Sequence, residues 1–240
     1  MKITVINGTE KRGVTYRLKE MFLKRFRADA EITEYYLPND CPNFCNGCAS
    51  CCLIGESACK DRAYILPIER SLNEADLIVI TSPAYVMHAT GAMKAFLDHL
   101  AYRWLPHRPA AEMFAKRAVI ITQCLGAGAK SAAKDIKHSA AWWGVSEIGV
   151  FTGALMSGID WDKLPEKRRK KLSNKICKLA DRFAKTDYSE PARTNTITKI
   201  KFAFCRLMQK KLYAADPEYA DAKYWHDKGW LGKARPWRTK

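Results

Sequence analysis

Six of the nine cysteines in this 240-residue chain lie between positions 41 and 59. Four of these six, Cys45, Cys48, Cys51 and Cys59, follow the spacing C-x2-C-x2-C-x7-C. Three thiolates at C-x-x-C-x-x-C spacing can bind one face of an iron–sulfur cubane, and a fourth completes a four-cysteine [4Fe–4S] site. Zinc also binds four cysteines, but its usual pattern is two C-x2-C pairs far apart in sequence. The segment predicts a cluster, with a loop shaped by reduced thiols as the alternative.

A second candidate site follows a β-branched stretch at residues 2–6 and runs from Asn7 to Thr15. This loop has hydroxyls near both ends, basic residues in the middle, and Gly13 just before a predicted helix. Such a loop can offer backbone N–H groups and a helix N-terminus to a phosphate. It lacks GxGxxG and GxxxxGKS/T, the motifs for a dinucleotide and a nucleoside triphosphate. Phosphate binding and an ordinary strand-to-helix turn both remain open.

Two more loops have compositions suited to a flat ligand. Residues 82–88 place Tyr85 and Met87 after an apolar strand, where both can pack against an aromatic ring. Residues 122–128 include small side chains that let backbone amides approach the polar edge of such a ring. Either loop alone is consistent with simple turn chemistry. Their predicted position at the same end of one sheet as Asn7–Thr15 favours a shared ligand site.

The elements that must position these loops alternate regularly along the chain. Short apolar or β-branched runs predict strands at residues 2–6, 31–37, 76–81, 117–122 and 146–151. Apolar residues at helical spacing predict helices at residues 15–28, 64–73, 90–103, 128–142 and 162–184. This alternation predicts an α/β fold with a doubly wound five-stranded parallel sheet in the flavodoxin-like order 2-1-3-4-5, where ligands bind at the carboxyl ends of the strands. The predicted domain covers residues 1–186, and a basic helical C-terminal extension covers residues 187–240.

Three ordered motifs resemble those of the flavodoxin-like NAD(P)H-dependent FMN reductases, including their iron–sulfur flavoprotein branch. The motifs are ITVINGTEKRGVTYRL at the N-terminus, CNGCASCCLIGESACKDR in the middle, and ITSPAYVMHATGAMKAFLDH after the third strand. Family members typically show N-G-S-P-R-x-x-G-x-T, then C-x-G-C-x-x-C with a further cysteine, then S-P-x-Y followed by G-x-x-K-x-F. The resemblance spans essentially the whole predicted domain, and the segment YWHDKGWLGKARPW resembles an extension found on some of these reductases.

The resemblance implies which residues bind FMN. Residues of the first loop would surround its phosphate: Thr9, Lys11, Arg12, Gly13, Val14 and Thr15. Residues of the second loop would line the isoalloxazine ring and the ribityl chain: Ser82, Pro83, Ala84, Tyr85 and Val86. Residues of the third loop would close over the ring edge: Thr122, Gln123, Cys124, Gly126 and Gly128. Glu10, Val14 and Cys124 depart from the family pattern, which weakens side-chain contacts but leaves the backbone amides in place.

By the same resemblance, the predicted function is an FMN-dependent oxidoreductase that passes electrons from NAD(P)H through the flavin to a small-molecule or protein acceptor. No side-chain acid or base is assigned a catalytic role. A second hypothesis is a ferredoxin-linked iron–sulfur flavoprotein with a [4Fe–4S] cluster on the four cysteines; many reductases of the family carry the same cysteine run without a known cluster. A third is a flavin-binding interaction module acting through the basic extension. The resemblance also implies a homodimer or homotetramer.

Composition limits other classes of function. Lys and Arg number 41 and Asp and Glu 25, a net charge of +16, of which residues 161–240 carry +13 (22 basic minus 9 acidic). No nucleic-acid-binding motif accompanies this charge, so no nucleic-acid partner is predicted. No apolar run reaches the roughly 18–20 residues that a membrane-spanning helix needs. The N-terminal residues have no signal-peptide h-region, so we expect a cytoplasmic protein.

Residues 195–213 predict a basic amphipathic helix in the extension. Its apolar stripe contains Ile197, Ile200, Phe204, Leu207 and Met208. Such a helix can lie on a membrane surface or bind an acidic partner. Because the bulky apolar ends of an interfacial anchor are missing, we expect the stripe to dock on the domain core or on a second subunit.

Overall fold

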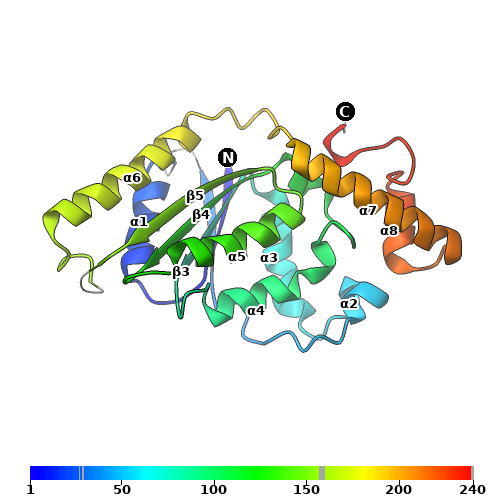
Figure 1. The fold of residues 1–240 in the computed structure, drawn as a ribbon, viewed down its shortest axis with the longest axis horizontal. Helices are drawn as coiled ribbons and strands as arrows, with labels where there is room; N and C mark the ends of the chain where they lie inside the picture. The colour runs from blue at the N-terminus through cyan, green and yellow to red at the C-terminus, as the bar shows by residue number, and fades with distance from the viewer. Residues whose placement is uncertain (27, 29, 157–159, 239–240) are drawn as a thin grey trace.

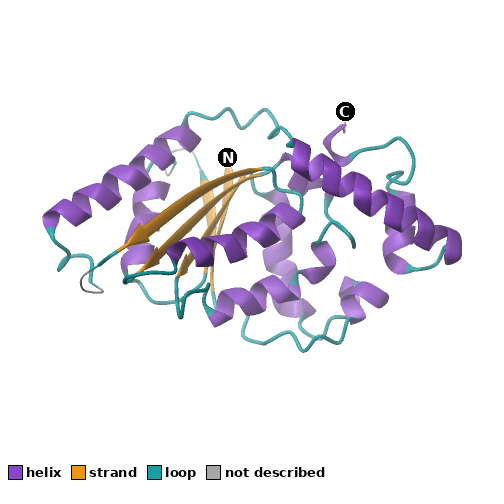
Figure 2. Ribbon diagram, in the orientation of Figure 1, coloured by secondary structure: helices purple, strands orange, loops and turns teal. Residues whose placement is uncertain are grey.

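The computed structural model describes residues 1–26, 28, 30–156 and 160–238. Its strands form one sheet: β1 (Lys2–Asn7), β2 (Glu31–Tyr36), β3 (Leu77–Pro83), β4 (Arg117–Cys124) and β5 (Glu147–Ala154). The order is β2-β1-β3-β4-β5, and every neighbouring pair is parallel. All strands therefore end at the same edge of the sheet (Figure 2). The predicted flavodoxin-like fold is confirmed.

Helices cover both faces of this sheet (Figure 1). They are α1 (Val14–Leu23), α2 (Ser50–Leu53), α3 (Arg62–Glu74), α4 (Gly91–His99), α5 (Ala129–Trp142), α6 (Glu166–Ala184), α7 (Thr196–Ala215) and α8 (Ala220–Asp227). One hydrophobic core lies between the sheet and α3, α4 and α5, and a second lies between the sheet and α1 and α6. This double cover explains why β3 is buried throughout and reads as a continuous apolar run.

The boundaries of several elements differ from those predicted. The helix predicted at 90–103 ends at His99, and a short 3-10 turn over Ala101–Arg103 follows it. The helix predicted at 162–184 begins only at Glu166, because Pro165 occupies its N-cap. Helix α1 ends at Leu23, earlier than the predicted 28, and residue 27 lies outside the described residues. Helix α2, inside the cysteine segment, was not predicted.

The described part of the C-terminal segment, residues 187–238, packs on the chain beyond the sheet through a third hydrophobic cluster. Phe202 of α7 and Trp225 of α8 stack with ring centroids 4.7 Å apart. Phe202 also meets the edge of Phe114, which lies in the connection between α4 and β4, at 5.9 Å. Leu105 and Trp230 belong to the same buried cluster. In Figure 1 this cluster lies on the right, where α7 and α8 sit away from the sheet.

We expected the apolar stripe of α7 to dock on the domain core or on a second subunit. It does not dock on the core, so the first of these two expectations is wrong. Its members Ile197, Ile200, Phe204 and Leu207 are 68%, 64%, 69% and 59% exposed. The residues of α7 that face the protein are instead Thr198, Phe202, Cys205 and Gln209. The aromatic cluster holds α7 by Phe202, and this rotation turns the stripe outward. Among the described residues, no helix is long and apolar enough to span a membrane.

Candidate functional site

The loops that follow the strands meet at the carboxyl edge of the sheet, and hydrogen bonds join one loop to the next. The Thr90 hydroxyl donates to the carbonyl oxygen of Gly8 (2.6 Å), which connects the loops after β3 and β1. The backbone N–H of Ala84 donates to the carbonyl oxygen of Gln123 (2.7 Å), which connects β3 to β4. The three predicted ligand loops therefore form one continuous rim.

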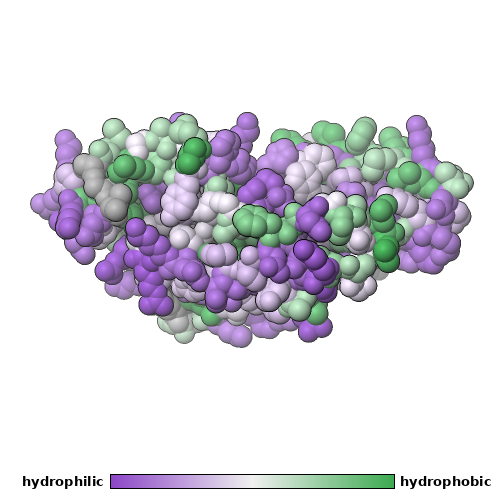
Figure 3. Space-filling view, turned by 90° about the horizontal axis from the view of Figure 1, so that it is seen from below, coloured by the Kyte–Doolittle hydropathy of each residue, from purple (hydrophilic) through white to green (hydrophobic). Residues whose placement is uncertain are grey.

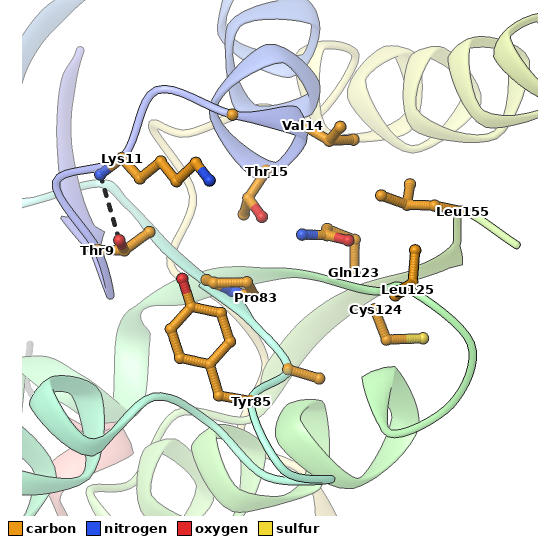
Figure 4. A pocket seen from close by; sticks show the side chains of 12 residues that line it. Thr9, Lys11, Val14, Thr15, Pro83, Tyr85, Gln123, Cys124, Leu125 and Leu155 are labelled. Carbon is orange, nitrogen blue, oxygen red and sulfur yellow. Dashed lines mark hydrogen bonds between the residues drawn. The ribbon is translucent and has the colours of Figure 1, made fainter. Parts of the chain in front are cut away.

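This rim encloses a pocket (Figure 4). From the predicted flavin residues, the pocket is lined by Thr9, Lys11, Gly13, Val14, Thr15, Pro83, Ala84, Tyr85, Gln123 and Cys124. All three predicted loops contribute to this lining. Its two remaining members, Leu125 and Leu155, were not predicted.

The end of the pocket nearest α1 has the chemistry of an anion site. Helix α1 begins at Val14, and its N-cap Gly13 makes no side-chain capping bond. The first N–H groups of the helix are therefore left for a ligand, and the positive end of the helix dipole favours an anion there. The exposed side chains of Lys11 and Arg12 add positive charge beside this terminus. Thr9 turns the loop toward it by accepting a hydrogen bond from the N–H of Lys11 (3.2 Å).

Two polar atoms of the pocket are buried without a hydrogen-bond partner among the described residues. They are the hydroxyl oxygen of Thr15 and the side-chain oxygen of Gln123. Both side chains point into the space between the labelled residues (Figure 4). A buried polar atom left unpaired costs about 1–3 kcal/mol, so such atoms usually have a ligand or water as partner. A phosphate at Thr15 and the polar edge of a flavin at Gln123 would satisfy them, and the pocket residues thus fit FMN.

Six predicted flavin residues lie outside this pocket: Arg12, Ser82, Val86, Thr122, Gly126 and Gly128. Ser82 and Thr122 are buried, and their hydroxyls donate to the carbonyl oxygens of Pro83 (2.9 Å) and Ala129 (2.8 Å). They fix the loops rather than face the ligand space. Val86 is 94% exposed. Gly126 and Gly128 line a neighbouring cavity that shares Cys124 with the pocket.

Leu155 had no signal in the sequence, because it follows β5, for which no ligand loop was predicted. Its N–H donates to the carbonyl oxygen of Cys124 (2.9 Å), which carries the β4–β5 pairing one residue further and places Leu155 at the rim. Leu125 could have been found, since it lies between two predicted residues in the loop after β4.

The cysteine segment lies at another edge of the molecule, near α2 and below α4 in Figure 1. Cys45 and Cys48 are exposed, whereas Cys51 and Cys59 are half-buried. Burial raises the pKa of the Cys51 thiol; a hydrogen bond with Cys52 lowers it, and the nearby thiols of Cys59, Cys45 and Cys48 raise it further. The four thiols do not gather into one ligand set: among the described residues, the group of three or more possible metal ligands that lie within 4.8 Å of one another contains Cys59 but not Cys45, Cys48 or Cys51.

The inner side of Cys59 faces further donor groups. The sulfur of Cys59, a carboxylate oxygen of Asp61 and a ring nitrogen of His99 lie within 4.8 Å of one another. Asp61 and His99 are 4% and 3% exposed, and each has one buried side-chain atom that no described residue hydrogen-bonds. The sequence motif contained Asp61 but offered no reason to bring His99 to it. An oxygen donor and a nitrogen donor therefore lie beside the thiol of Cys59.

The remaining cysteines of this segment are poor ligands in comparison. Burial raises the pKa of Cys41 to about 11. Burial and the neighbouring Cys51 raise the pKa of Cys52 to about 12. Without a metal, both thiols therefore ionise less readily than an exposed cysteine. The same segment exposes Phe44, Leu53 and Ile54 (72%, 60% and 73%). Figure 3, seen from below, shows apolar patches scattered among hydrophilic side chains on this face of the molecule.

The sheet order, with a pocket at the carboxyl edge of the strands, defines the flavodoxin-like class of α/β proteins. Residues 1–162 match the family described as NADPH-dependent FMN reductase, and the chain belongs to this family. It is therefore an FMN-dependent, NAD(P)H-dependent oxidoreductase. This match confirms the predicted family and FMN as the predicted cofactor.

Two curated relatives are iron–sulfur flavoproteins. One, from Archaeoglobus fulgidus, is 23% identical over 237 residues, which cover 95% of this chain and 99% of the relative. The other, from Clostridioides difficile, is 26% identical over 193 residues, 76% of this chain and 78% of the relative. Among solved structures, an FMN-dependent NADH-azoreductase from Bacillus anthracis in complex with FMN is 12% identical, with a TM-score of 0.57 over 77% of this chain and 100% of that one. At this identity the structural likeness supports the fold.

Proposed function

We propose that the carboxyl-edge pocket is the FMN site. Thr9, Lys11, Arg12 and the N–H groups at Gly13–Thr15 would bind the phosphate, and the buried Thr15 hydroxyl, which no described residue hydrogen-bonds, is the observation that carries this assignment. Bound FMN supplies the hydride acceptor and the electron donor of the reaction. The protein's part is to hold and orient it and to exclude water.

The opposite end of the pocket suits the isoalloxazine ring. Pro83, Ala84 and Tyr85 give it an apolar floor with an aromatic rim, and Tyr85 is 50% exposed, so one face stays open to a second ring such as nicotinamide. The Gln123 side chain would meet the polar edge of the flavin. The buried Ser82 and Thr122 would support the loops from behind, with Cys124, Val86, Gly126 and Gly128 at the outer margin.

Replacement of Thr15 tests this assignment. Thr15→Val removes the hydroxyl at nearly constant volume, and hydrogen bonds to charged groups contribute about 1.5–3 kcal/mol. The Kd for FMN, measured by quenching of flavin fluorescence on titrating apoprotein, should rise about tenfold or more. Thr186→Val is the matched control, because the Thr186 hydroxyl donates to the carbonyl of Arg182 at the exposed end of α6, away from the pocket. An unchanged Kd in Thr15→Val would contradict the phosphate assignment.

A second candidate function is electron transfer through a [4Fe–4S] cluster on Cys45, Cys48, Cys51 and Cys59, with ferredoxin as donor or acceptor. The spacing C-x2-C-x2-C-x7-C of these four cysteines favours it, and so do the two relatives named as iron–sulfur flavoproteins. Iron and labile sulfide analysis after anaerobic purification decides between the two: about four of each per chain supports the cluster, and none leaves a two-electron reductase with a small-molecule acceptor.

We further propose a homodimer or homotetramer in the cytoplasm, with residues 187–240 as an extension of the 1–186 domain. The outward stripe of α7 supports self-association, because a row of exposed large apolar side chains on a helix usually marks an interface. All nine cysteines lie in the described part of the chain and are free thiols there, which suits a reducing compartment. Phe204→Asp should lower the mass measured by light scattering to that of one chain; an unchanged oligomer would exclude this stripe as the interface.

A further inference from the structure

We propose that Asp221 of α8 and Arg108 together position the cysteine segment, so that the C-terminal segment is a structural part of that site. Arg108 lies in the connection between α4 and β4, more than fifty residues from Cys51 and Cys52 in sequence. Only the expected effect on iron binding rests on the cluster proposed above. The geometric claim concerns the thiols themselves and can be tested without metal.

The guanidinium of Arg108 is the link to the cysteine segment. It donates to the carbonyl oxygens of Cys51 and of Cys52, the latter at 3.2 Å. Its Nε donates to the carboxylate of Glu56 at 3.3 Å. Arg108 is 9% exposed, so these bonds are made largely out of water. A planar guanidinium can satisfy several acceptors at fixed angles, which a lysine ammonium cannot do.

Helix α2 needs such support because its own residues do little to stabilise it. It spans only Ser50–Leu53 and contributes no buried residue. Its N-cap, Ala49, has a positive φ of 58° and makes no side-chain capping bond. The carbonyls of a final helical turn lack partners within the helix, and so short a helix is not stable alone. Arg108 supplies partners to two of these carbonyls.

The position of Arg108 is fixed in turn by the C-terminal segment. Asp221 is 1% exposed and accepts hydrogen bonds from Arg108 and, at 2.7 Å, from the ring Nδ1 of His107. The Trp225 indole N–H donates to the carbonyl of His107 at 2.6 Å. Tyr224 donates likewise to the carbonyl of Pro109 at 2.8 Å.

Helix α7 adds one more contact to the same stretch of chain. The side-chain amide of Gln209, itself 1% exposed, donates to the carbonyl of Pro106 at 2.5 Å. Four consecutive residues, 106–109, are thus each hydrogen-bonded by the C-terminal segment. The chain of contacts runs from α7 and α8, through residues 106–109, to the backbone of Cys51 and Cys52.

Removing the Asp221 charge breaks this series of contacts at a buried ion pair. Truncating one partner of a buried ion pair leaves the other charge without compensation, and the local structure rearranges to expose it. In Asp221→Asn, Glu56 is the charged partner that Arg108 keeps among the described residues. The Glu56 side chain is 43% exposed. We expect Arg108 to turn toward water and release both carbonyls of α2.

The test is cysteine alkylation in reduced, metal-free full-length protein, followed by mass spectrometry of each thiol. Asp221→Asn should accelerate alkylation of the half-buried Cys51 and Cys52 at least tenfold, and leave the already exposed Cys45 and Cys48 at wild-type rates. Glu218→Gln is the matched control, because it removes a carboxylate near α8 that pairs with the exposed Lys223 rather than with Arg108. The FMN content of each variant reports whether the sheet domain is intact.

Arg108→Lys is the second variant and keeps the positive charge. It should accelerate alkylation of Cys51 and Cys52 as Asp221→Asn does, since an ammonium cannot bridge the carbonyls and the carboxylate. After anaerobic reconstitution, both variants should hold less than half the wild-type iron while keeping wild-type FMN. Wild-type alkylation rates at Cys51 and Cys52 in both variants would overturn the proposal. Absence of iron from the wild type would overturn only the cluster, because the alkylation result stands without it.

Discussion

The carboxyl-edge pocket, which we propose as the FMN site, and the cysteine segment are built in opposite ways. The pocket is a rim of backbone bonds between neighbouring loops, such as Ala84 to Gln123, on the edge of a buried sheet. The cysteine segment has one short helix without buried residues, and side chains from far along the chain hold it. Loops joined by backbone bonds keep their arrangement when side chains change, whereas a segment held by side chains depends on a few of them for its arrangement. Single substitutions should therefore affect the two sites differently.

The largest expected effect is on metal content. Cys51→Ser removes one of the four proposed cluster ligands, so iron per chain after anaerobic reconstitution should fall close to zero. FMN content should not change, because no residue of the pocket lies in the cysteine segment. Cys177→Ser, a half-buried cysteine on α6, is the control and should keep its iron. Loss of FMN together with iron would show that the two sites are not separate.

Backbone strain should destabilise the loops that form the pocket. Gly128 has a φ of +101°, and a Cβ there would lie 2.8 Å from the Cα of Met87. Gly128→Ala should therefore lower the free energy of unfolding by about 2 kcal/mol, the usual cost of a strained backbone, and weaken FMN binding. Thermal unfolding with and without FMN measures both effects.

The neighbouring Gly126 provides the matched control for this strain. A Cβ at Gly126 would meet no atom of the described residues within 4 Å, and its φ is not in the left-handed region. Gly126→Ala should change stability by less than about 0.5 kcal/mol, as surface substitutions usually do. Equal effects at both glycines would contradict the assigned cause.

A smaller effect concerns the pair of Lys19 and Glu34, which joins α1 to β2. Burial alone would raise the pKa of Glu34, but hydrogen bonds and the charge of the buried Lys19 hold it below its ordinary value. A lowered folded-state pKa contributes stability above the unfolded value near 4.5, and this contribution is lost as the pH falls through the folded value.

Glu34→Gln should therefore reduce the loss of stability as the pH falls below about 4.5. Urea unfolding of both proteins at several pH values measures the difference. The alkylation rate of Cys51 should not change in this variant, because neither Lys19 nor Glu34 belongs to the cysteine segment. Parallel pH curves for the two proteins would show that Glu34 does not contribute as stated.

The sequence was most informative where structure is local. Continuous apolar runs predicted β3 and β4, and turn residues after them predicted the loops that meet at the pocket. Burial of Ser82 and Thr122 was not predictable, since a hydroxyl at the end of a strand can bond either to a ligand or to the backbone. The same holds for Leu155, whose place at the rim depends on the β4–β5 pairing.

Long-range contacts were beyond the sequence pattern. Periodicity predicted the stripe of α7 correctly as a stripe, but it could not tell which face Phe202 and the tryptophans of the C-terminal segment would hold inward. Nothing in the spacing of Arg108 and Asp221, 113 residues apart, predicted their contact. The surplus of basic residues in 161–240 is noticeable in the sequence. It says less about the role of the C-terminal segment than the one buried carboxylate of Asp221 does.

The independence of the two sites is tested most directly by measuring FMN and iron in the same samples of wild type and Asp221→Asn, purified and reconstituted without oxygen. An absorption spectrum with iron quantitation gives both contents per chain. We predict one FMN per chain in both proteins, and iron that is present in the wild type and at least halved in the variant. A wild type without FMN, or a variant that loses FMN and iron in equal proportion, would contradict this prediction.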